Sequence, residues 1–244
     1  MGIFQELFYR PLLNLLFFIY NLGVVDLGVA IIILTVVVRL VLLPLFYKSA
    51  KDQTILQKIY PKIQEAQKKH KDDKEKQVKE IMGIYKEHKV NPFSGFLLLL
   101  VQLPILIGLY QVFLKGFSDQ TLTHLYSFVS TPAVVNTSFL GLVPLDQNNI
   151  ILVFLAGVFQ YLQSYILLRV NKKESSGPAM VQNITKKMVF FAPLLTIVIL
   201  YSLPSAVALY WLTTSVFSVG QQLVINKNIH KEDGTHNGGD EKRS

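Results

Sequence analysis

The sequence predicts an all-α polytopic membrane protein in which five transmembrane helices surround a hydrophilic groove. Hydrophobic residues make up 51% of the 244 residues and charged residues only 16%, a composition typical of proteins with several apolar spans. The apolar residues are gathered into long runs, and about 20 such residues cross the ~30 Å hydrocarbon core of a bilayer. Polar side chains recur within these runs. An N-terminal interfacial helix and a cytosolic helical hairpin complete the expected fold.

The N-terminal segment, residues 1–25, precedes the first apolar run and predicts an amphipathic helix outside the membrane core. Its apolar side chains share one helical stripe, while Glu6, Arg10 and Asn14 lie elsewhere. We expect this helix to lie in the membrane interface and to bend near Pro11. The alternative is a short core helix. The stripe consists of Phe8, Leu12, Leu15, Leu16 and Ile19.

The basic residues between the spans predict the orientation of the chain. Loops 48–91 and 169–187 are rich in lysine and arginine, whereas the outer loop 118–149 contains neither. Because cytoplasmic loops carry the excess of basic residues, the N-terminus is expected outside and the tail 226–244 inside a cell membrane. Neither a cleavable signal peptide nor a transit peptide is expected. The predicted spans are residues 26–47, 92–117, 150–168, 188–203 and 205–225.

Residues 48–91 predict an antiparallel helical hairpin outside the bilayer. The segment carries 12 lysines and 7 acidic residues, and two apolar stripes follow the helical spacing of i, i+3, i+4 and i+7. His70–Asp73 is the expected turn between them. The first stripe is Ile55, Leu56, Ile59, Ile63 and Ala66, and the second is Val78, Ile81, Met82 and Tyr85.

Arg39 is the only charged residue in the apolar run 27–47. A guanidinium keeps its proton, and placing it near the bilayer centre costs between ~2.5 and ~17 kcal/mol. Snorkelling towards the interface is one explanation. Pairing with a carboxylate is another explanation. However, Asp26, at the outer end of the first span, is the only Asp or Glu in the predicted spans. The sequence therefore favours a water-filled site around an unpaired cation.

Uncharged polar residues in the spans predict the lining of this groove. Thr35 precedes Arg39 by four residues and shares its helical face. The remaining groove candidates are Gln102, Gln160, Gln163, Tyr210, Trp211 and Thr214. The alternative to a groove role for each of them is an ordinary interhelical hydrogen bond, worth ~0.6 kcal/mol on average. Tyr210 and Trp211 also suit an interfacial aromatic belt.

The residues needed for catalysis are missing from the predicted spans. All five histidines fall in loops or tails, and the chain has neither cysteine nor a Gly-rich phosphate-binding loop. Serine–histidine proteolysis, metal catalysis and carboxylate proton relays therefore lack their groups. We expect no enzyme activity, no metal site and no cofactor.

Several segments resemble the YidC/Oxa/Alb family of membrane protein insertases, and the resemblance covers essentially the whole chain. The matching segments are DLGVAIIILTVVVRLVLLPL, QKIYPKIQEAQKKHKDDKEKQ, YKEHKVNPFSG, QLPILIGLY and LPSAVALYWLTTSVFSVGQQ. The chain is similar to a minimal bacterial member, without the large periplasmic domain or the lipidated N-terminal Cys of other members.

The resemblance implies a groove that is open to the cytosol and to lipid and closed on the outside. It implies nascent membrane proteins and lipids as partners, with the ribosome and the Sec translocon as further candidates. The hairpin, residues 49–89, is similar to a mobile region that first receives the substrate, and its candidate residues are Ile59, Pro61, His70, Asp73, Met82 and Tyr85. The implied groove residues are Arg39, Thr35, Gln163, Tyr210 and Trp211, with Gln160 one turn from Gln163.

Two other functions remain open at this stage. A small-anion channel or transporter would use Arg39 as its anion site, although no internal repeat supports a transporter. An assembly chaperone would hold other membrane subunits. The basic residues of the tail 226–244 offer a contact with ribosomal RNA, but four acids dilute their charge, so a solvated, disordered tail is expected. Specific DNA binding is not expected.

Overall fold

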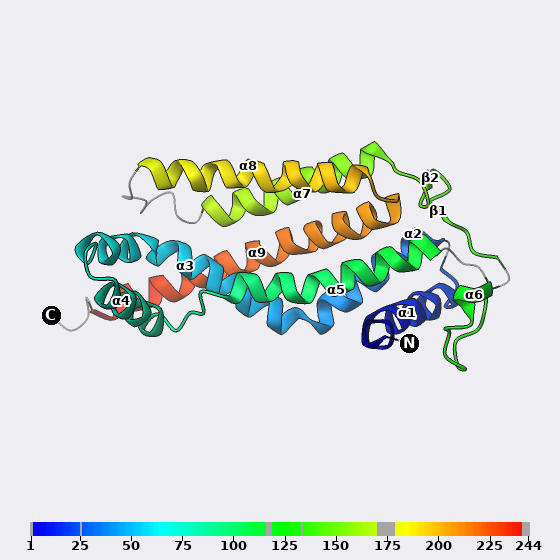
Figure 1. Cartoon of the computed structure of the whole chain (residues 1–244), viewed down its shortest axis with the longest axis horizontal. Coiled ribbons are helices and arrows are strands. Elements are labelled where there is room, and N and C mark those ends of the chain that lie inside the picture. Colours follow the sequence, from blue (N-terminus) through cyan, green and yellow to red (C-terminus); the bar gives the residue numbers. More distant parts are fainter. Residues whose placement is uncertain (1, 25, 116–118, 133, 170–178, 241–244) are drawn as a thin grey trace.

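The computed structural model describes residues 2–24, 26–115, 119–132, 134–169 and 179–240, and helices dominate it (Figure 1). A π-helical turn, η1 (Gln5–Tyr9), leads directly into α1. Two short antiparallel strands pair Ser138 with Pro144 and Phe139 with Val143. The elements are α1 (Arg10–Asn21), α2 (Leu27–Val41), α3 (Leu43–Lys69), α4 (Lys74–Glu87), α5 (Ser94–Lys115), α6 (Asp119–Leu122), β1 (Ser138–Phe139), β2 (Val143–Pro144), α7 (Ile150–Arg169), α8 (Ala179–Tyr201) and α9 (Ser205–Asp240).

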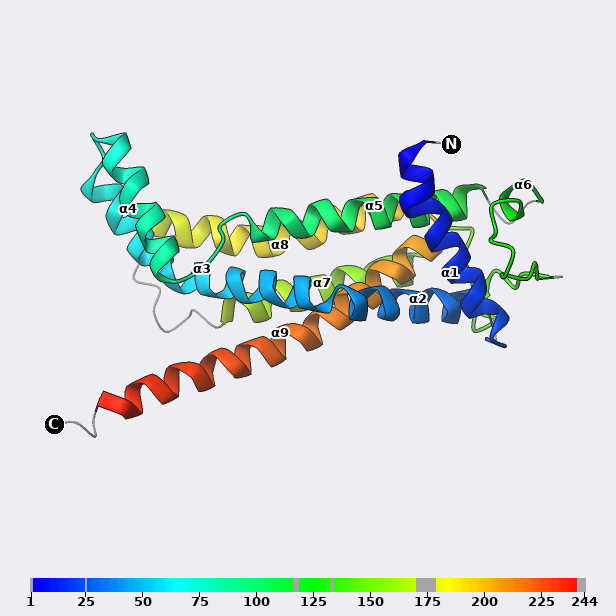
Figure 2. The ribbon, with the colours of Figure 1, turned by 90° about the horizontal axis from the view of Figure 1, so that it is seen from below.

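The helices form an elongated bundle with different structures at its two ends (Figures 1 and 2). The α3–α4 hairpin and the C-terminal part of α9 lie at one end, and α1, α6 and the strands lie at the other. Helix α9 runs through the bundle and contacts α2, α3, α5 and α7, while α8 packs on α7. The basic hairpin and the 118–149 loop are therefore separated along the bundle, as the predicted orientation requires. Residues 170–178 of the predicted basic loop 169–187 lie outside the described residues.

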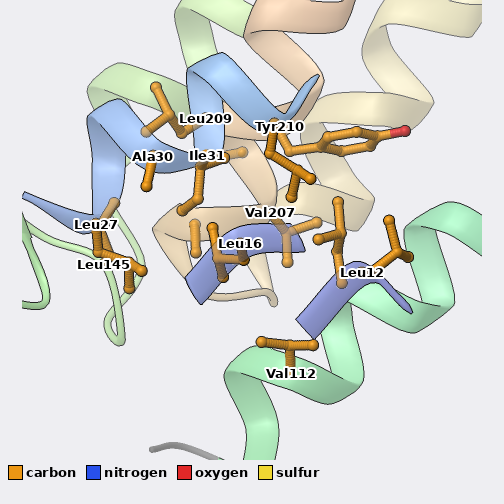
Figure 3. Close-up of a cluster of buried hydrophobic side chains, with 14 of the residues drawn as sticks. Leu12, Leu16, Leu27, Ala30, Ile31, Val112, Leu145, Val207, Leu209 and Tyr210 are labelled. Atoms are coloured by element: carbon orange, nitrogen blue, oxygen red, sulfur yellow. The ribbon is translucent and has the colours of Figure 1, made fainter. Parts of the chain in front are cut away.

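The apolar stripe of α1 faces protein and not lipid. Leu16 is fully buried, and Leu12 and Ile19 are 8% and 4% exposed. They belong to a core built from α1, α2, α5 and α9, with Leu145 of the outer loop (Figure 3). The predicted interfacial stripe is thus a packing surface, because α1 lies against α2 and α5, and the alternative of a short core helix fits it. The opposite side, which includes Ile3 and Leu7, is exposed.

Buried polar side chains tie the outer loop to the helices. Asp26 is 1% exposed; its carboxylate caps α2 by accepting the Val29 N–H at 2.9 Å and also accepts the Leu140 N–H at 2.8 Å. Asn14 accepts the Tyr126 N–H at 2.5 Å and donates to the His124 carbonyl at 3.1 Å. Asn14, expected away from the packed stripe of its helix, therefore helps to hold the outer loop in place.

The first predicted span is broken at Leu42. The sequence predicts one helix through residue 47, but α2 ends at Val41 and α3 begins at Leu43 at an angle of 70°. Pro44 lies in the first turn of α3. Its ring has no N–H for an intrahelical bond and clashes with the preceding turn, which explains the break. The first helix of the hairpin therefore begins inside the expected span.

Among the described helices, α5 is the one that is long and apolar enough to cross a bilayer by itself. Helices α2 and α3 would together form a second span, which is bent. Ile150–Ile166 in α7 and Phe190–Tyr201 in α8 are shorter apolar helices. Helix α9 extends past residue 225 to Asp240, where a disordered tail is expected; adding residues to an existing helix requires no new nucleation. The five-span count stays a prediction.

The hairpin has a small core of its own. Ile59, Ile63 and Val90 are buried, and Ile81 and Tyr85 pack against them. Two members of the predicted second stripe do not join this core, since Val78 is 59% and Met82 47% exposed. Ile84 packs against the core instead. The core includes Val90, which follows the end of α4, so the face of α4 that packs is not the predicted stripe.

Candidate functional site

Arg39 lies in the last turn of α2 and is 7% exposed. Its guanidinium carbon is 4.2 Å from the centre of the Phe46 ring, which belongs to α3 and is 6% exposed. In a straight helix these residues would share a face but lie ~10 Å apart along the axis, so the bend at Leu42 brings them together. Sequence analysis missed Phe46; its spacing of two turns from Arg39 and the nearby Pro44 were the available signals.

The charge of Arg39 is not neutralised by a carboxylate within the described part of the chain. The ion pairs there involve other residues. The Tyr210 side chain of α9 is close enough to interact electrostatically with the guanidinium. A cation–π contact orients an arginine without cancelling its charge. The site therefore combines burial with an intact positive charge and free N–H donors.

The hydroxyls near Arg39 differ in their availability. Thr35 is 1% exposed and donates to the Ile31 carbonyl of its own helix at 2.6 Å, so its hydrogen is already used. Thr214, one turn after Tyr210, is 8% exposed. Thr35 is four residues before Arg39 and therefore lies on the same face of α2.

Gln102 joins this group from α5. Its side-chain amide donates to the Tyr210 hydroxyl, and Tyr210 is 3% exposed. In Figure 3 the Tyr210 hydroxyl points away from the labelled aliphatic side chains of the core. Arg39, Tyr210 and Gln102 thus form a polar group contributed by three helices that are far apart in the sequence.

Gln160 and Trp211 form a second, separate polar group. The Trp211 indole Nε1–H donates to Gln160 Oε1 at 2.5 Å, and the Thr196 hydroxyl of α8 donates to the same oxygen at 3.0 Å. Consecutive helical residues point ~100° apart, so Tyr210 and Trp211 face different neighbours. The interhelical hydrogen bond considered as the alternative accounts for Gln160, and Thr196 is a partner that sequence analysis missed.

Gln163 is the one groove candidate on α7 whose amide is not used for packing. It is half-buried and has no hydrogen bond to the residues that the structure describes. It lies three residues from Gln160, about one turn along α7. Of the two glutamines on this helix, Gln160 bonds to α8 and α9, whereas Gln163 has no amide partner among the described residues.

Comparison with known proteins decides the family. The family described as the 60Kd inner membrane protein matches residues 18–232. The chain belongs to the YidC/Oxa/Alb family of membrane protein insertases. The family resemblance predicted from the sequence is therefore confirmed, and the chain is a membrane protein.

Named members of the YidC/Oxa/Alb family align with most of the chain. The membrane protein insertase MisCB of Bacillus subtilis is 34% identical over 96% of this chain and 84% of its own length. The membrane protein insertase YidC of Oceanobacillus iheyensis is 34% identical over 93% of this chain and 84% of its own length. The YidC of Nitratidesulfovibrio vulgaris is 35% identical over 87% of this chain but only 37% of its own length.

Most hairpin candidates of this YidC/Oxa/Alb member have structural roles. Ile59 is in the hairpin core, and Pro61 lies inside α3. His70 Nε2 contacts Glu80 at 2.5 Å, and the His70 and Lys69 side chains hold the pKa of Glu80 below its usual value. Asp73 caps α4 by accepting the Lys76 N–H at 3.0 Å, a bond that lowers its pKa.

Met82 and Tyr85 are the hairpin candidates that border a cleft, and Tyr85 also packs against the hairpin core. Both line a cleft of about 380 Å³ between α4, the start of α3 and the start of α5. Met82 is 47% exposed, so its flexible thioether is accessible. Four of the six hairpin candidates therefore maintain the hairpin, Met82 borders the cleft, and Tyr85 does both.

Proposed function

We propose that this protein inserts short or single-pass membrane proteins into the bilayer and assists their folding. The observation that carries the proposal is Arg39, a buried guanidinium in an apolar helix, stacked on Phe46 and without a carboxylate partner in the described residues. The family relatives named as membrane protein insertases support the same function.

The proposed route is a hydrophilic groove among five spans, open to the cytosol and to lipid and closed on the outside. The N-terminus lies outside and the C-terminus inside. The hairpin receives the incoming segment, and Met82 and Tyr85 are the candidate residues that border the cleft. Arg39, Tyr210, Gln102, Thr35, Gln163 and Thr214 are the proposed contacts within the groove.

Arg39 acts in the next step by attracting acidic residues of the translocated segment. Two opposite charges 4 Å apart are worth ~1 kcal/mol in water but ~4 kcal/mol at the lowered dielectric of a protein surface. The Phe46 contact keeps the guanidinium in place while its N–H groups stay available for a carboxylate. A polar segment thereby crosses a shortened apolar path.

The final step is the transfer of the client helix into lipid. Burial of apolar surface contributes ~25 cal/mol per Å², so the step proceeds without nucleotide hydrolysis. A membrane potential adds ~2.3 kcal/mol per charge per 100 mV and favours outward movement of acids when the outside is positive. The ribosome and the Sec translocon are proposed as suppliers of clients at the hairpin end of the bundle.

Reconstitution tests this function directly. The purified protein in liposomes receives a ribosome-free single-span client with an acidic translocated segment, and protease protection measures insertion. Arg39→Ala is expected to lower insertion at least ~10-fold, and Arg39→Lys to keep part of it, because a single charge pair in the groove is worth several kcal/mol. Normal insertion by the alanine variant would contradict the charge-attraction step.

A matched client and a flux assay supply the controls. A client with Asn and Gln in place of its translocated acids should insert equally well with the wild-type protein and with the Arg39→Ala variant. Small-anion flux through the same liposomes should not exceed that of protein-free liposomes. Flux that depends on Arg39 would favour an anion channel instead.

A further inference from the structure

The cleft at the base of the hairpin combines positive charge with an apolar exit. It is lined by Lys48 of α3, Lys86 of α4 and Lys89 in the following turn, and Asp52 is the only acid in its lining. All three lysines are exposed, whereas Asp52 is 6% exposed. Three cationic groups against one carboxylate give the cleft an excess of two positive charges when all four are ionised.

The backbone at the cleft adds to this positive character. Pro92 and Phe93 line it immediately before α5 begins at Ser94, and the Asn91 side chain accepts the Phe93 N–H at 2.9 Å. A helix N-terminus carries a partial positive charge, which favours an anion nearby; the Phe93 and Ser94 N–H groups themselves are bonded to Asn91. The cleft is therefore suited to a negatively charged group.

An exposed apolar stripe on α5 starts at the same cleft. Phe93 is 70% exposed, Phe96 60% and Leu100 51%, and their spacing places them on one helical face. The stripe continues with Leu103, Ile107 and Leu114, which are 43–60% exposed. Helix α5 is long and apolar enough to span a bilayer, so this face is where acyl chains would lie.

We propose that this cleft binds the phosphate headgroup of an anionic phospholipid, with its acyl chains along the Phe93–Leu114 stripe of α5. A free phosphate would use the lysines but not the stripe, and a neutral lipid would use the stripe but not the lysines. The bound lipid fixes the start of α5 and the base of the hairpin at the membrane surface. This site is distinct from Arg39, but its cleft is also lined by Met82 and Tyr85, the proposed receiving residues of the hairpin.

Lipid binding by the full-length protein tests the site. Native mass spectrometry of the detergent-purified chain would compare phosphatidylglycerol with phosphatidylcholine of identical acyl chains. We expect one retained phosphatidylglycerol per chain and at least ~10-fold weaker retention of phosphatidylcholine. The triple variant Lys48→Gln, Lys86→Gln and Lys89→Gln should lose this preference by at least ~10-fold, since each basic residue near an anionic surface contributes ~1 kcal/mol.

A second triple variant controls for general attraction between the hairpin and anionic lipid. Lys71→Gln, Lys74→Gln and Lys79→Gln remove the same charge from exposed positions around the tip of the hairpin and should leave retention within ~2-fold. Arginine at the three cleft positions should preserve binding, which would show that a loss with glutamine reflects charge and not misfolding.

Several results would overturn the proposal. Equal losses from the cleft and tip variants would indicate non-specific attraction, and no loss from either would place the lipid elsewhere. Equal retention of phosphatidylcholine would leave only an apolar contact. Displacement of the lipid by millimolar glycerol phosphate would assign the cleft to a free phosphate, and displacement by a micromolar acidic peptide would assign it to a protein client.

Discussion

Arg39 stacks on Phe46 across the break between α2 and α3, with the guanidinium carbon 4.2 Å from the ring centre. Both residues are buried, and Tyr210 of α9 interacts with the same guanidinium. The position of the cation in the bundle therefore depends on the 70° bend at Leu42. An intramembrane charge in a straight helix would lack this aromatic support.

Replacing Phe46 should weaken insertion without removing the charge. Phe46→Leu is expected to lower insertion of clients with acidic segments by about 2- to 30-fold, because a cation–π contact contributes about 0.5–2 kcal/mol. Phe46→Trp should retain it. Protease protection in liposomes measures the effect, with Phe154→Leu, at a 59% exposed position of α7, as the matched control. Equal activity of the Phe46→Leu and Phe154→Leu variants would mean that the stacking has no role.

Gln160 and Gln163 should respond differently to the same substitution. Gln160→Leu removes the acceptor of Trp211 and Thr196 and should destabilise the fold by about 1–3 kcal/mol. Gln163→Leu should change stability by less than ~0.5 kcal/mol but lower insertion. Thermal unfolding in nanodiscs, combined with the insertion assay, separates the two effects. The assignment fails if both variants unfold at the same temperature.

The bond between Gln102 and Tyr210 can be measured with a double-mutant cycle. Tyr210→Phe and Gln102→Leu each remove one partner of the bond, and their coupling energy should be about 0.6–1.7 kcal/mol, the range found for interhelical hydrogen bonds in membranes. Unfolding of the four proteins in the same nanodiscs gives this value. A coupling energy of zero would show that the two side chains act independently.

Asp52 should make the hairpin base sensitive to pH. Burial raises its pKa, opposed by the Asn91 N–H, Lys48 and Lys51. Because the pKa of Asp52 is higher in the folded state, Asp52 takes up a proton on folding when the pH lies between the unfolded and folded pKa values. The contribution to stability is therefore fully present below the unfolded value, ~3.9, and is lost as the pH rises through the folded value. Asp52→Asn should remove this dependence.

Hydrogen exchange of the Asn91 amide between pH 4 and pH 7, corrected for intrinsic exchange rates, measures the effect at Asp52. Asp52→Ala is the contrasting variant: it leaves the Asn91 N–H without its acceptor and should reduce protection at every pH, by about 1 kcal/mol. A protection factor that rises with pH in the wild-type protein would have the wrong sign and would contradict the burial argument.

Asp26 should be needed to hold the outer loop. Asp26→Ala removes the acceptor for both Val29 and Leu140 and is expected to cost about 1–3 kcal/mol. Asp26→Asn keeps one acceptor oxygen and should cost about half as much. Limited proteolysis of the loop and thermal unfolding would show the order wild type, Asn, Ala. Equal stability of all three would leave Asp26 without this role.

The helices themselves were largely predictable, because apolar periodicity and breaking residues are local properties of the sequence. The turn after Lys69 and the start of α9 at Ser205 follow from such signals. The element that each apolar face packs against could not be predicted from the local sequence. The stripe of α1 meets α2 and α5 instead of lipid, and Met82 of α4 borders a cleft instead of the hairpin core.

The candidate site was predictable to a similar degree. Arg39 and Thr35 are four residues apart in one helix, so spacing alone places them on one face. The contact of Arg39 with Phe46 depends on the break at Leu42, and the nearness of Tyr210 depends on packing between α2 and α9. Gln160 and Gln163 could not be told apart by their positions in the sequence, and only the partners of Gln160 distinguish them.

The amino-acid sequence by itself determined the family, the helical content and the presence of an arginine deep in an apolar run, because composition, periodicity and motif order are written along the chain. Only the tertiary structure decided which side chains hold that arginine, which glutamine is committed to packing and where the hairpin lysines converge. Those relationships depend on contacts between residues far apart in the chain, such as Gln102 and Tyr210, and they exist only once the helices pack.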